Sequence, residues 1–437
     1  MEPTTAGVRA IAAPPGALWR SHPLVLLAPL ALLHVEMLGY DLRHPDRFLN
    51  GDRATERIEV IRGFAQAWQS GDVTSYIAAH GIVGDWLPQA LLYMAGGQHF
   101  VIGVQIVLAL ASVLWVRQIA LRAALGEGAA TACAALYALL PHTLVFPHQL
   151  VAEAIFDPLI VLSFLLCITR AGLGGLALGA ATLVRPVTAL WPLVHAGLAR
   201  MRGRSRAAYL VAALAPLCLW MSFMWLATGE FSMGRSGHDL GANLYSRAHR
   251  MSANLPQEER PPVRGPGQRK LTLGEYLRFV AAHPDAALAH SARDLATLTF
   301  KSGVERLLLD YFDLFELERA ALQDTASGWR AQLERQGAVA TLAQVLQRSP
   351  ALMAGSMVGA ALFALFMLAA VYGTAALLRA GGERRQQALL LAAFVVYTFA
   401  TAQAVDAAQS RHRAPAEFAL CLLAVAGLTA RLRRYGS

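Results

Sequence analysis

The sequence carries little charge for its size. Asp, Glu, Lys and Arg together make up 15% of the 437 residues, whereas hydrophobic residues make up 56%. Soluble domains contain roughly 25% charged residues. This composition, with a mean hydropathy of +0.42, therefore excludes an ordinary soluble domain and indicates an integral membrane protein.

Cysteine and lysine are also rare, and the sequence has no nucleotide-binding motif. All four cysteines lie inside apolar runs without paired metal-ligand spacing, so we expect neither a disulfide framework nor a metal site. The chain has no Gly-rich nucleotide fingerprint and no repeat of 20–50 residues, which argues against a nucleotide-dependent enzyme and a repeat array. The formal charge of +9 comes almost entirely from Arg. The arginines are distributed as expected for the topology of a membrane protein, and we expect no nucleic-acid partner.

Eight apolar runs have about the 20-residue length of a transmembrane helix. They lie at 23–40, 98–116, 128–146, 150–169, 207–228, 351–378, 387–405 and 414–430. A further run, 172–198, is interrupted by Arg185-Pro186, and a continuous span there would place an Arg at mid-bilayer at a cost of several kcal/mol. We expect two half-helices instead, because a broken backbone is tolerated where protein buries it. The predicted fold is an all-α polytopic membrane protein with about eight full spans, one broken helical hairpin and helices on the outer face.

Charge placement predicts the orientation. The segments that contain Arg9, Arg117, Arg170, Arg200–Arg206, Arg379 and the C-terminal Arg residues hold 15 Arg against three acids. The segment 41–97 holds five Arg against seven acids, and 230–350 is nearly balanced. The positive-inside rule places the first group in the cytoplasm and the other two outside. The first run could instead be a signal peptide, but no convincing cleavage site follows it, so we expect an uncleaved anchor.

This topology divides the chain into three parts. Residues 1–228 form an N-terminal transmembrane module with a first outer loop at 41–97 and the half-helix hairpin at 172–198. Residues 229–350 form an extracytoplasmic segment with helices expected at 272–282, 284–300, 303–322 and 327–347, and 351–437 form a C-terminal transmembrane module. In the first outer loop, 53–68 predicts an amphipathic helix whose apolar face lies on the membrane surface: Ile58, Val60, Ile61, Phe64 and Trp68.

Ionisable residues gather at the outer ends of the predicted spans. They are Asp52, His142, His148, Glu153, Asp157, Arg185, Asp406, Arg411, His412 and Arg413. Glu153 and Asp157 are four residues apart and share one helix face. A carboxylate can take a proton from a hydroxyl, and Arg can hold a phosphate through its two-pronged guanidinium. The set suits a reaction in which an anionic group leaves a lipid, although charges at helix ends often only mark the interface.

Four stretches carry a resemblance through their order and placement: GDRATERIEVIRGFAQAWQSGD, ALYALLPHTLVFPHQLVAEAIFDPLIVLSFLL, LALGAATLVRPVTALWPLV and SRHRAPAEFALCLLAVAGL. Together they resemble the polyprenyl-phosphate-dependent glycosyltransferases of the GT-C fold, which include protein O-mannosyltransferases and lipid A aminoarabinose transferases. The resemblance covers 20–230 and 385–430, with 230–350 matched least. It implies a GT-C-like helical bundle in the bacterial inner membrane with the active site facing outward.

The resemblance also implies roles for individual residues. Asp52 takes the place of the catalytic first-loop Asp, and Arg185, Arg411 and Arg413 match the basic residues of the hairpin and of the last span. Where the family often has a second acid and then a Tyr, this chain has Arg53 and Glu56, so Glu56 is an alternative to the second carboxylate. Further candidates are Glu153 for catalysis and His142 and His148 for substrate binding.

The expected reaction moves a sugar from a polyprenyl-phosphate donor to a hydroxyl on a lipid, glycan or protein acceptor. Asp52 would act as the general base and Arg residues would stabilise the departing phosphate. A divalent cation remains an alternative as a cofactor, although no motif supports one. The alternatives are a secondary transporter, a surface-polysaccharide polymerase or ligase, and a membrane scaffold without catalysis.

Overall fold

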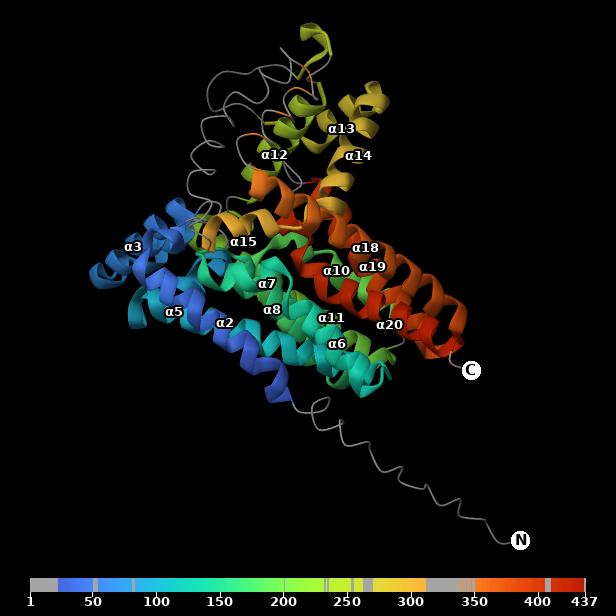
Figure 1. The fold of residues 1–437 in the computed structure, drawn as a ribbon. Coiled ribbons are helices and arrows are strands. Elements are labelled where there is room, and N and C mark those ends of the chain that lie inside the picture. Colours follow the sequence, from blue (N-terminus) through green and yellow to red (C-terminus); the bar gives the residue numbers. More distant parts are fainter. Residues whose placement is uncertain are drawn as a thin grey trace.

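The computed structural model describes residues 23–49, 54–80, 83–199, 201–231, 233, 236–252, 255–261, 270–311, 337, 340, 343, 347, 350–404 and 410–435. Every regular element among them is a helix and none is a strand, which confirms the predicted all-α class. Figure 1 shows a tilted bundle of long helices with a smaller group of helices on one end.

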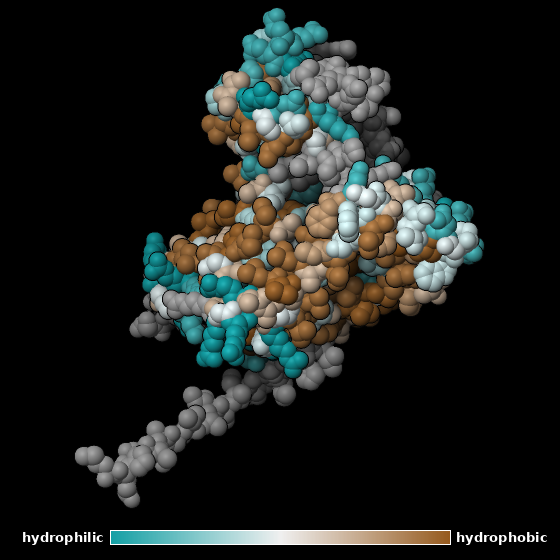
Figure 2. Space-filling view, turned by 180° about the vertical axis from the view of Figure 1, so that it is seen from behind, coloured by the Kyte–Doolittle hydropathy of each residue, from teal (hydrophilic) through white to brown (hydrophobic). Residues whose placement is uncertain are grey.

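The bundle contains most of the predicted apolar runs. Its helices are α2 (Pro23–Arg43), α5 (Leu87–Arg122), α6 (Glu127–Ala138), α7 (Pro141–Val145), α8 (Glu153–Thr169), α9 (Ala171–Val184), α10 (Trp191–Leu198), α11 (Gly203–Thr228), α18 (Pro350–Ala380), α19 (Gly382–Ala404) and α20 (Glu417–Tyr435). The face of this bundle seen in Figure 2 is largely hydrophobic, and hydrophilic residues gather toward its ends. The structure therefore supports a membrane protein.

The number of full-length spans is lower than the predicted eight. Over the described residues, three helices are long and apolar enough to cross a membrane alone: Leu87–Arg122, Gly203–Thr228 and Met353–Ala380. A fourth is gained if Glu127–Ala138 and Pro141–His148, bent by 63°, form one broken span. The count is lower because some apolar runs form helices that are short or broken, and hydropathy alone does not reveal this. Pro141 cannot continue the helix, and α8 has only 17 residues.

The predicted break at Arg185-Pro186 is confirmed. Helix α9 ends at Val184, Arg185 is extended with φ −140° and ψ 114°, and the 3₁₀ turn η4 (Pro186–Thr188) leads into α10. The ring of Pro186 disfavours helical geometry at the residue before it. The hairpin is uneven, because α9 has 14 residues and α10 has eight.

Glycines allow the bundle helices to approach closely. A Cβ on Gly373 of α18 would overlap the carbonyl oxygen of Leu423 on α20, and Gly427 faces it from that helix. On the other side of the bundle, a Cβ on Gly175 of α9 would overlap the carbonyl of Tyr209 on α11. Small residues at such contacts are typical of membrane bundles.

The substitution Gly373→Ala is expected to destabilise the protein by about 1–3 kcal/mol, because two helix backbones must separate to admit one methyl group. Gly103→Ala is the matched control, since a Cβ at Gly103 meets no atom within 4 Å. Removing a helix glycine there should be neutral or stabilise the protein by up to about 1 kcal/mol. Thermal unfolding in detergent measures both variants, and equal effects would contradict the close-approach explanation.

Two groups of helices flank the bundle. Helices α3 (Ala54–Ser70) and α4 (Val73–His80) lie on one side, and α12 (Ser236–Met251), α13 (Leu273–Ala282) and α14 (Pro284–Phe300) form a layer on one end (Figure 1). The short helix α15 (Val304–Tyr311) crosses that end. The described residues also form short 3₁₀ turns: η1 (Pro45–Leu49), η2 (Val83–Asp85), η3 (Phe146–His148), η6 (Gln257–Glu259) and η8 (Ser410–Ala416).

These outer helices agree with the predicted ranges where they are described. Helices α13 and α14 fall on 272–282 and 284–300, and α15 covers the first part of 303–322; the rest of that range and most of 327–347 lie outside the described residues. Thr272 and Glu275 form a reciprocal capping box at the start of α13.

Helix α3 was predicted correctly, but its environment was not. Ile58, Ile61 and Phe64 are buried against Trp86, Val101 and other residues of the protein. Trp68, expected on the same apolar face, is 55% exposed. The apolar face therefore covers protein, not the membrane surface, because the start of α5 folds under it.

A buried ion pair holds together the layer of α12, α13 and α14, called the outer layer below. Arg247 Nη1 of α12 donates to Asp294 Oδ2 of α14 at 2.8 Å, and its Nε donates to the Tyr276 hydroxyl of α13 at 3.1 Å. His290 lies 3.6 Å from the same Asp294 oxygen. Burial lowers the pKa of His290, and the positive charges of Arg247 and Arg250 add to this effect against the opposing charge of Asp294.

The outer layer is expected to lose stability as the pH falls below about 6.5, where the unfolded histidine takes up a proton. The folded layer favours neutral His290. The contribution of His290 to the free energy of unfolding is therefore complete above that pH and declines below it. Hydrogen exchange of α12–α14, corrected for intrinsic rates, should show weaker protection at pH 5.5 than at pH 7.5. His290→Gln should reduce this difference, and an unchanged difference would assign it to another group.

Candidate functional site

Glu153 is the centre of the cluster that the structure forms from the predicted residues. It lies in the first turn of α8, where the helix dipole favours a negative charge, and it is 3% exposed. Arg185 Nη1, from the break after α9, donates to Glu153 Oε1 at 2.6 Å. Arg411 of η8 reaches the same oxygen with Nε at 4.0 Å. Three of the predicted site residues, separated by up to 258 positions in the chain, therefore meet at one carboxylate.

Both arginines keep contact with solvent. The side chain of Arg185 is 25% exposed and that of Arg411 is 15% exposed, whereas Glu153 lies beneath them. A buried carboxylate without a partner would cost several kcal/mol, so the arginines also stabilise it. The arrangement brings two partly exposed arginines to one buried carboxylate, which suits the binding of a phosphate or carboxylate.

A third arginine, Arg57 of α3, was not among the predicted site residues. Its Nη1 donates to the Leu150 carbonyl at 2.8 Å and its Nη2 to Asp85 Oδ1 at 2.8 Å. It is close enough to Glu153 to act on it electrostatically. It is one of the three arginines in the segment FLNGDRATERIEVIRGF, and that unusual charge density was the available signal.

The first-loop residues to which the resemblance assigns catalysis and binding, Asp52 and Arg53, lie outside the described residues. The chain on either side is anchored near α8. The Leu150 amide donates to the Phe48 carbonyl at 3.0 Å, and Phe48, Ala54 and Leu150 belong to one buried cluster. Phe48 therefore contacts a residue three positions before Glu153. Glu56 is exposed on the first turn of α3.

His142 and Arg413 lie at a second carboxylate, Glu417, which the sequence did not single out. His142 Nδ1 is 2.9 Å from Glu417 Oε1, and Arg413 Nε donates to the same oxygen at 3.2 Å. Arg413 is fully buried, donates to the carbonyls of Leu298 and Lys301, and stacks on Phe363 at 3.7 Å. This placement favours a structural role for Arg413, which ties η8 to α14 and α18.

His148 belongs to a third cluster. Its Nδ1 is 2.6 Å from Asp41 Oδ2, and its Nε2 is 2.9 Å from His34 Nδ1. All three side chains are buried between α2 and η3. Neither His34 nor Asp41 was predicted, because each lies in or at the end of the first apolar run. The cluster fastens α2 to η3 and gives His148 no exposed surface.

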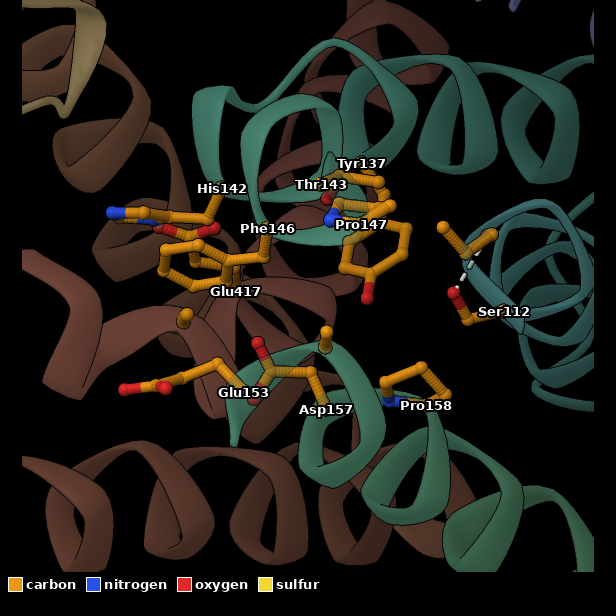
Figure 3. Close-up of a pocket in the computed structure, with 13 residues that line it drawn as sticks. Ser112, Tyr137, His142, Thr143, Phe146, Pro147, Glu153, Asp157, Pro158 and Glu417 are labelled. Atoms are coloured by element: carbon orange, nitrogen blue, oxygen red, sulfur yellow. Dashed lines mark hydrogen bonds and ion pairs between the residues drawn. The ribbon is translucent and has the colours of Figure 1, made fainter. Parts of the chain in front are cut away.

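A small pocket is lined on one side by Glu153 and by residues of the surrounding helices (Figure 3). Its cavity has a volume of about 20 Å³. Its polar lining comes from five elements and consists of Ser112, Tyr137, His142, Thr143, Glu153, Asp157 and Glu417. Asp157 is 9% exposed, and its Oδ1 has no hydrogen-bond partner among the described residues.

The other predicted residues are placed as follows. His412 is buried in η8, and Asp406 lies outside the described residues. His142 and His148 contact different carboxylates, so they do not form a joint site. Within the described ranges, no group of three or more His, Cys, Asp or Glu side chains is placed to hold a metal ion.

Comparison with known proteins gives no relative. No protein-family description, curated protein or solved structure matches the chain.

Proposed function

We propose that the protein is a membrane glycosyltransferase that moves a sugar from a polyprenyl-phosphate donor to a hydroxyl acceptor on the outer side of the membrane. The observation that carries this proposal is the meeting of Arg185 and Arg411 at Glu153. Two partly exposed guanidinium groups at the end of apolar helices suit an anionic headgroup whose lipid tail stays in the bilayer. The GT-C-like organisation and the inner-membrane location belong to the same proposal.

In the proposed reaction, the acceptor hydroxyl attacks the anomeric carbon of the sugar with inversion. Asp52 takes the hydroxyl proton, a new carbon–oxygen bond forms, and the bond between the anomeric carbon and the phosphate oxygen breaks. Polyprenyl phosphate leaves with the electron pair, and Arg185 and Arg411 stabilise its additional negative charge. Glu153 orients both arginines. Phe48 is hydrogen-bonded to Leu150 and Ala54 belongs to the same buried cluster, so the proposal places Asp52, which lies between them in the sequence, near Glu153.

The test uses the purified protein in nanodiscs with radiolabelled polyprenyl-phosphate sugars and a membrane extract as acceptor source. The expected result is release of free polyprenyl phosphate together with transfer of label to the extract. Heat-inactivated protein provides the control. A panel of sugars in which no donor binds or reacts would contradict the proposal.

A secondary transporter is the second candidate, because broken helices and buried charges are also transporter features. Transporters usually contain two related halves. In the described C-terminal part, α18, α19 and α20 are continuous helices and give no counterpart to the α9–α10 break. Uptake of an unmodified solute by proteoliposomes, without any chemical transfer, would favour the transporter.

A further inference from the structure

The pocket that Glu153 lines contains a carboxylate with an unusual environment. Asp157 is nine-tenths buried, lines the cavity, and has an Oδ1 atom without a hydrogen-bond partner among the described residues. Figure 3 shows its carboxylate pointing into the pocket, whereas that of Glu153 points away. A buried polar atom without a partner costs about 1–3 kcal/mol, and more when it is charged. An occupant of the pocket would remove this cost.

The charges around Asp157 indicate the sign of that occupant. Glu153 is paired with Arg185 and Arg411, and Glu417 is paired with Arg413. Asp157 forms no ion pair with any described residue, and two of the three groups that act on it electrostatically are the carboxylates of Glu153 and Glu417. Asp157 is therefore the carboxylate of this group that has no cation in contact with it among the described residues, and a cation in the pocket would supply that partner.

Size and ligand chemistry narrow the choice. A cavity of about 20 Å³ holds one particle of the size of a water molecule, not a sugar. The available ligands are the oxygens of Asp157, Tyr137, Ser112 and Thr143, and hard cations prefer such oxygens. The residues do not form the three-ligand cluster of a divalent or transition-metal site. We propose that this pocket binds one monovalent inorganic cation, Na⁺ or K⁺, with Asp157 as its principal ligand.

This proposal does not depend on the proposed glycosyl transfer, and its test measures stability and binding. Purified protein is unfolded by heat in NaCl, KCl or choline chloride at equal ionic strength. Na⁺ or K⁺ is expected to raise the Tm of the wild type by roughly 5 °C at 100-fold excess over Kd, relative to choline. Asp157→Asn should lose this response. Asp285→Asn, which changes an exposed carboxylate in the first turn of α14, should keep it.

Direct binding provides the second measurement. The wild type should retain about one ²²Na⁺ or ⁸⁶Rb⁺ per molecule, and Asp157→Asn should retain none. If Asp157→Asn does not fold, Tyr137→Phe and Ser112→Ala provide milder variants, which should weaken isotope binding several-fold. Equal Tm values in all three salts, with no retained isotope, would overturn the proposal and indicate a proton on Asp157 instead. Wild-type isotope binding by Asp157→Asn would overturn it as well.

Discussion

Asp52→Asn is expected to lower the rate of sugar transfer by about 10²–10⁴-fold, because asparagine cannot accept the proton of the acceptor hydroxyl. Donor affinity should change little, since the phosphate is assigned to Arg185 and Arg411 and not to Asp52. Single-turnover transfer with a bound radiolabelled donor measures the chemical step, and equilibrium binding of the donor measures the affinity. The combination of a large rate loss with retained binding is specific to a residue that acts in the chemical step.

Two neighbouring variants complete this experiment. Glu59→Gln removes an exposed carboxylate of α3 from the same outer segment and should leave transfer within about twofold of the wild type. Glu56→Gln tests the alternative base. If Glu56→Gln abolishes transfer and Asp52→Asn does not, the base is Glu56. If neither variant slows transfer, the first outer loop does not supply the base and Glu153 becomes the next candidate.

The sequence predicted the break at Arg185, and it placed Arg185 at the same membrane level as Glu153, Arg411 and the other ionisable residues, for physical reasons. An Arg beside a Pro within an apolar run has few low-energy positions, so both a break and a partner were expected there. Residues at the outer ends of spans share one level of the membrane, which limits the distances between them. Topology therefore gave Glu153, Arg185 and Arg411 a common level, and helix packing decides which of the residues at that level make contact.

Other features depended on packing that no local pattern encodes. Arg57 donates to a carbonyl 93 positions away, and His142 contacts a carboxylate 275 positions away. Glu417 was not among the predicted site residues, because nothing in the sequence around it indicates its contacts with His142 and Arg413. The apolar face of α3 fitted a membrane surface and a protein surface equally well, and only the position of α5 decides between them. Hydropathy likewise counted 128–146 as one span, although Pro141 breaks it.

Arg185→Met is expected to weaken donor binding by about 10²-fold and also to destabilise the fold. The loss of a charge-assisted, two-pronged phosphate contact accounts for the first effect. The second arises because Glu153 stays buried with only the more distant Arg411 beside it, at 4.0 Å. Breaking a buried ion pair costs about 3–5 kcal/mol, and the 25% exposure of Arg185 and the nearby Arg411 should reduce this figure. Thermal unfolding and donor titration on the same preparation measure both effects.

The double variant Arg185→Met/Glu153→Gln separates the two effects. It removes both charges, so most of the lost stability should return, because replacing both members of a buried pair is often nearly neutral. Donor affinity should stay low, since the guanidinium that holds the phosphate is still absent. Arg117→Met is the matched control, because it removes a buried Arg of α5 that is paired with Glu127 at the start of α6. It should lower stability and leave the donor affinity of the folded protein unchanged. Recovery of donor binding together with stability in the double variant would show that Arg185 only maintains the fold, and the phosphate site would have to be sought at Arg57 and Arg411.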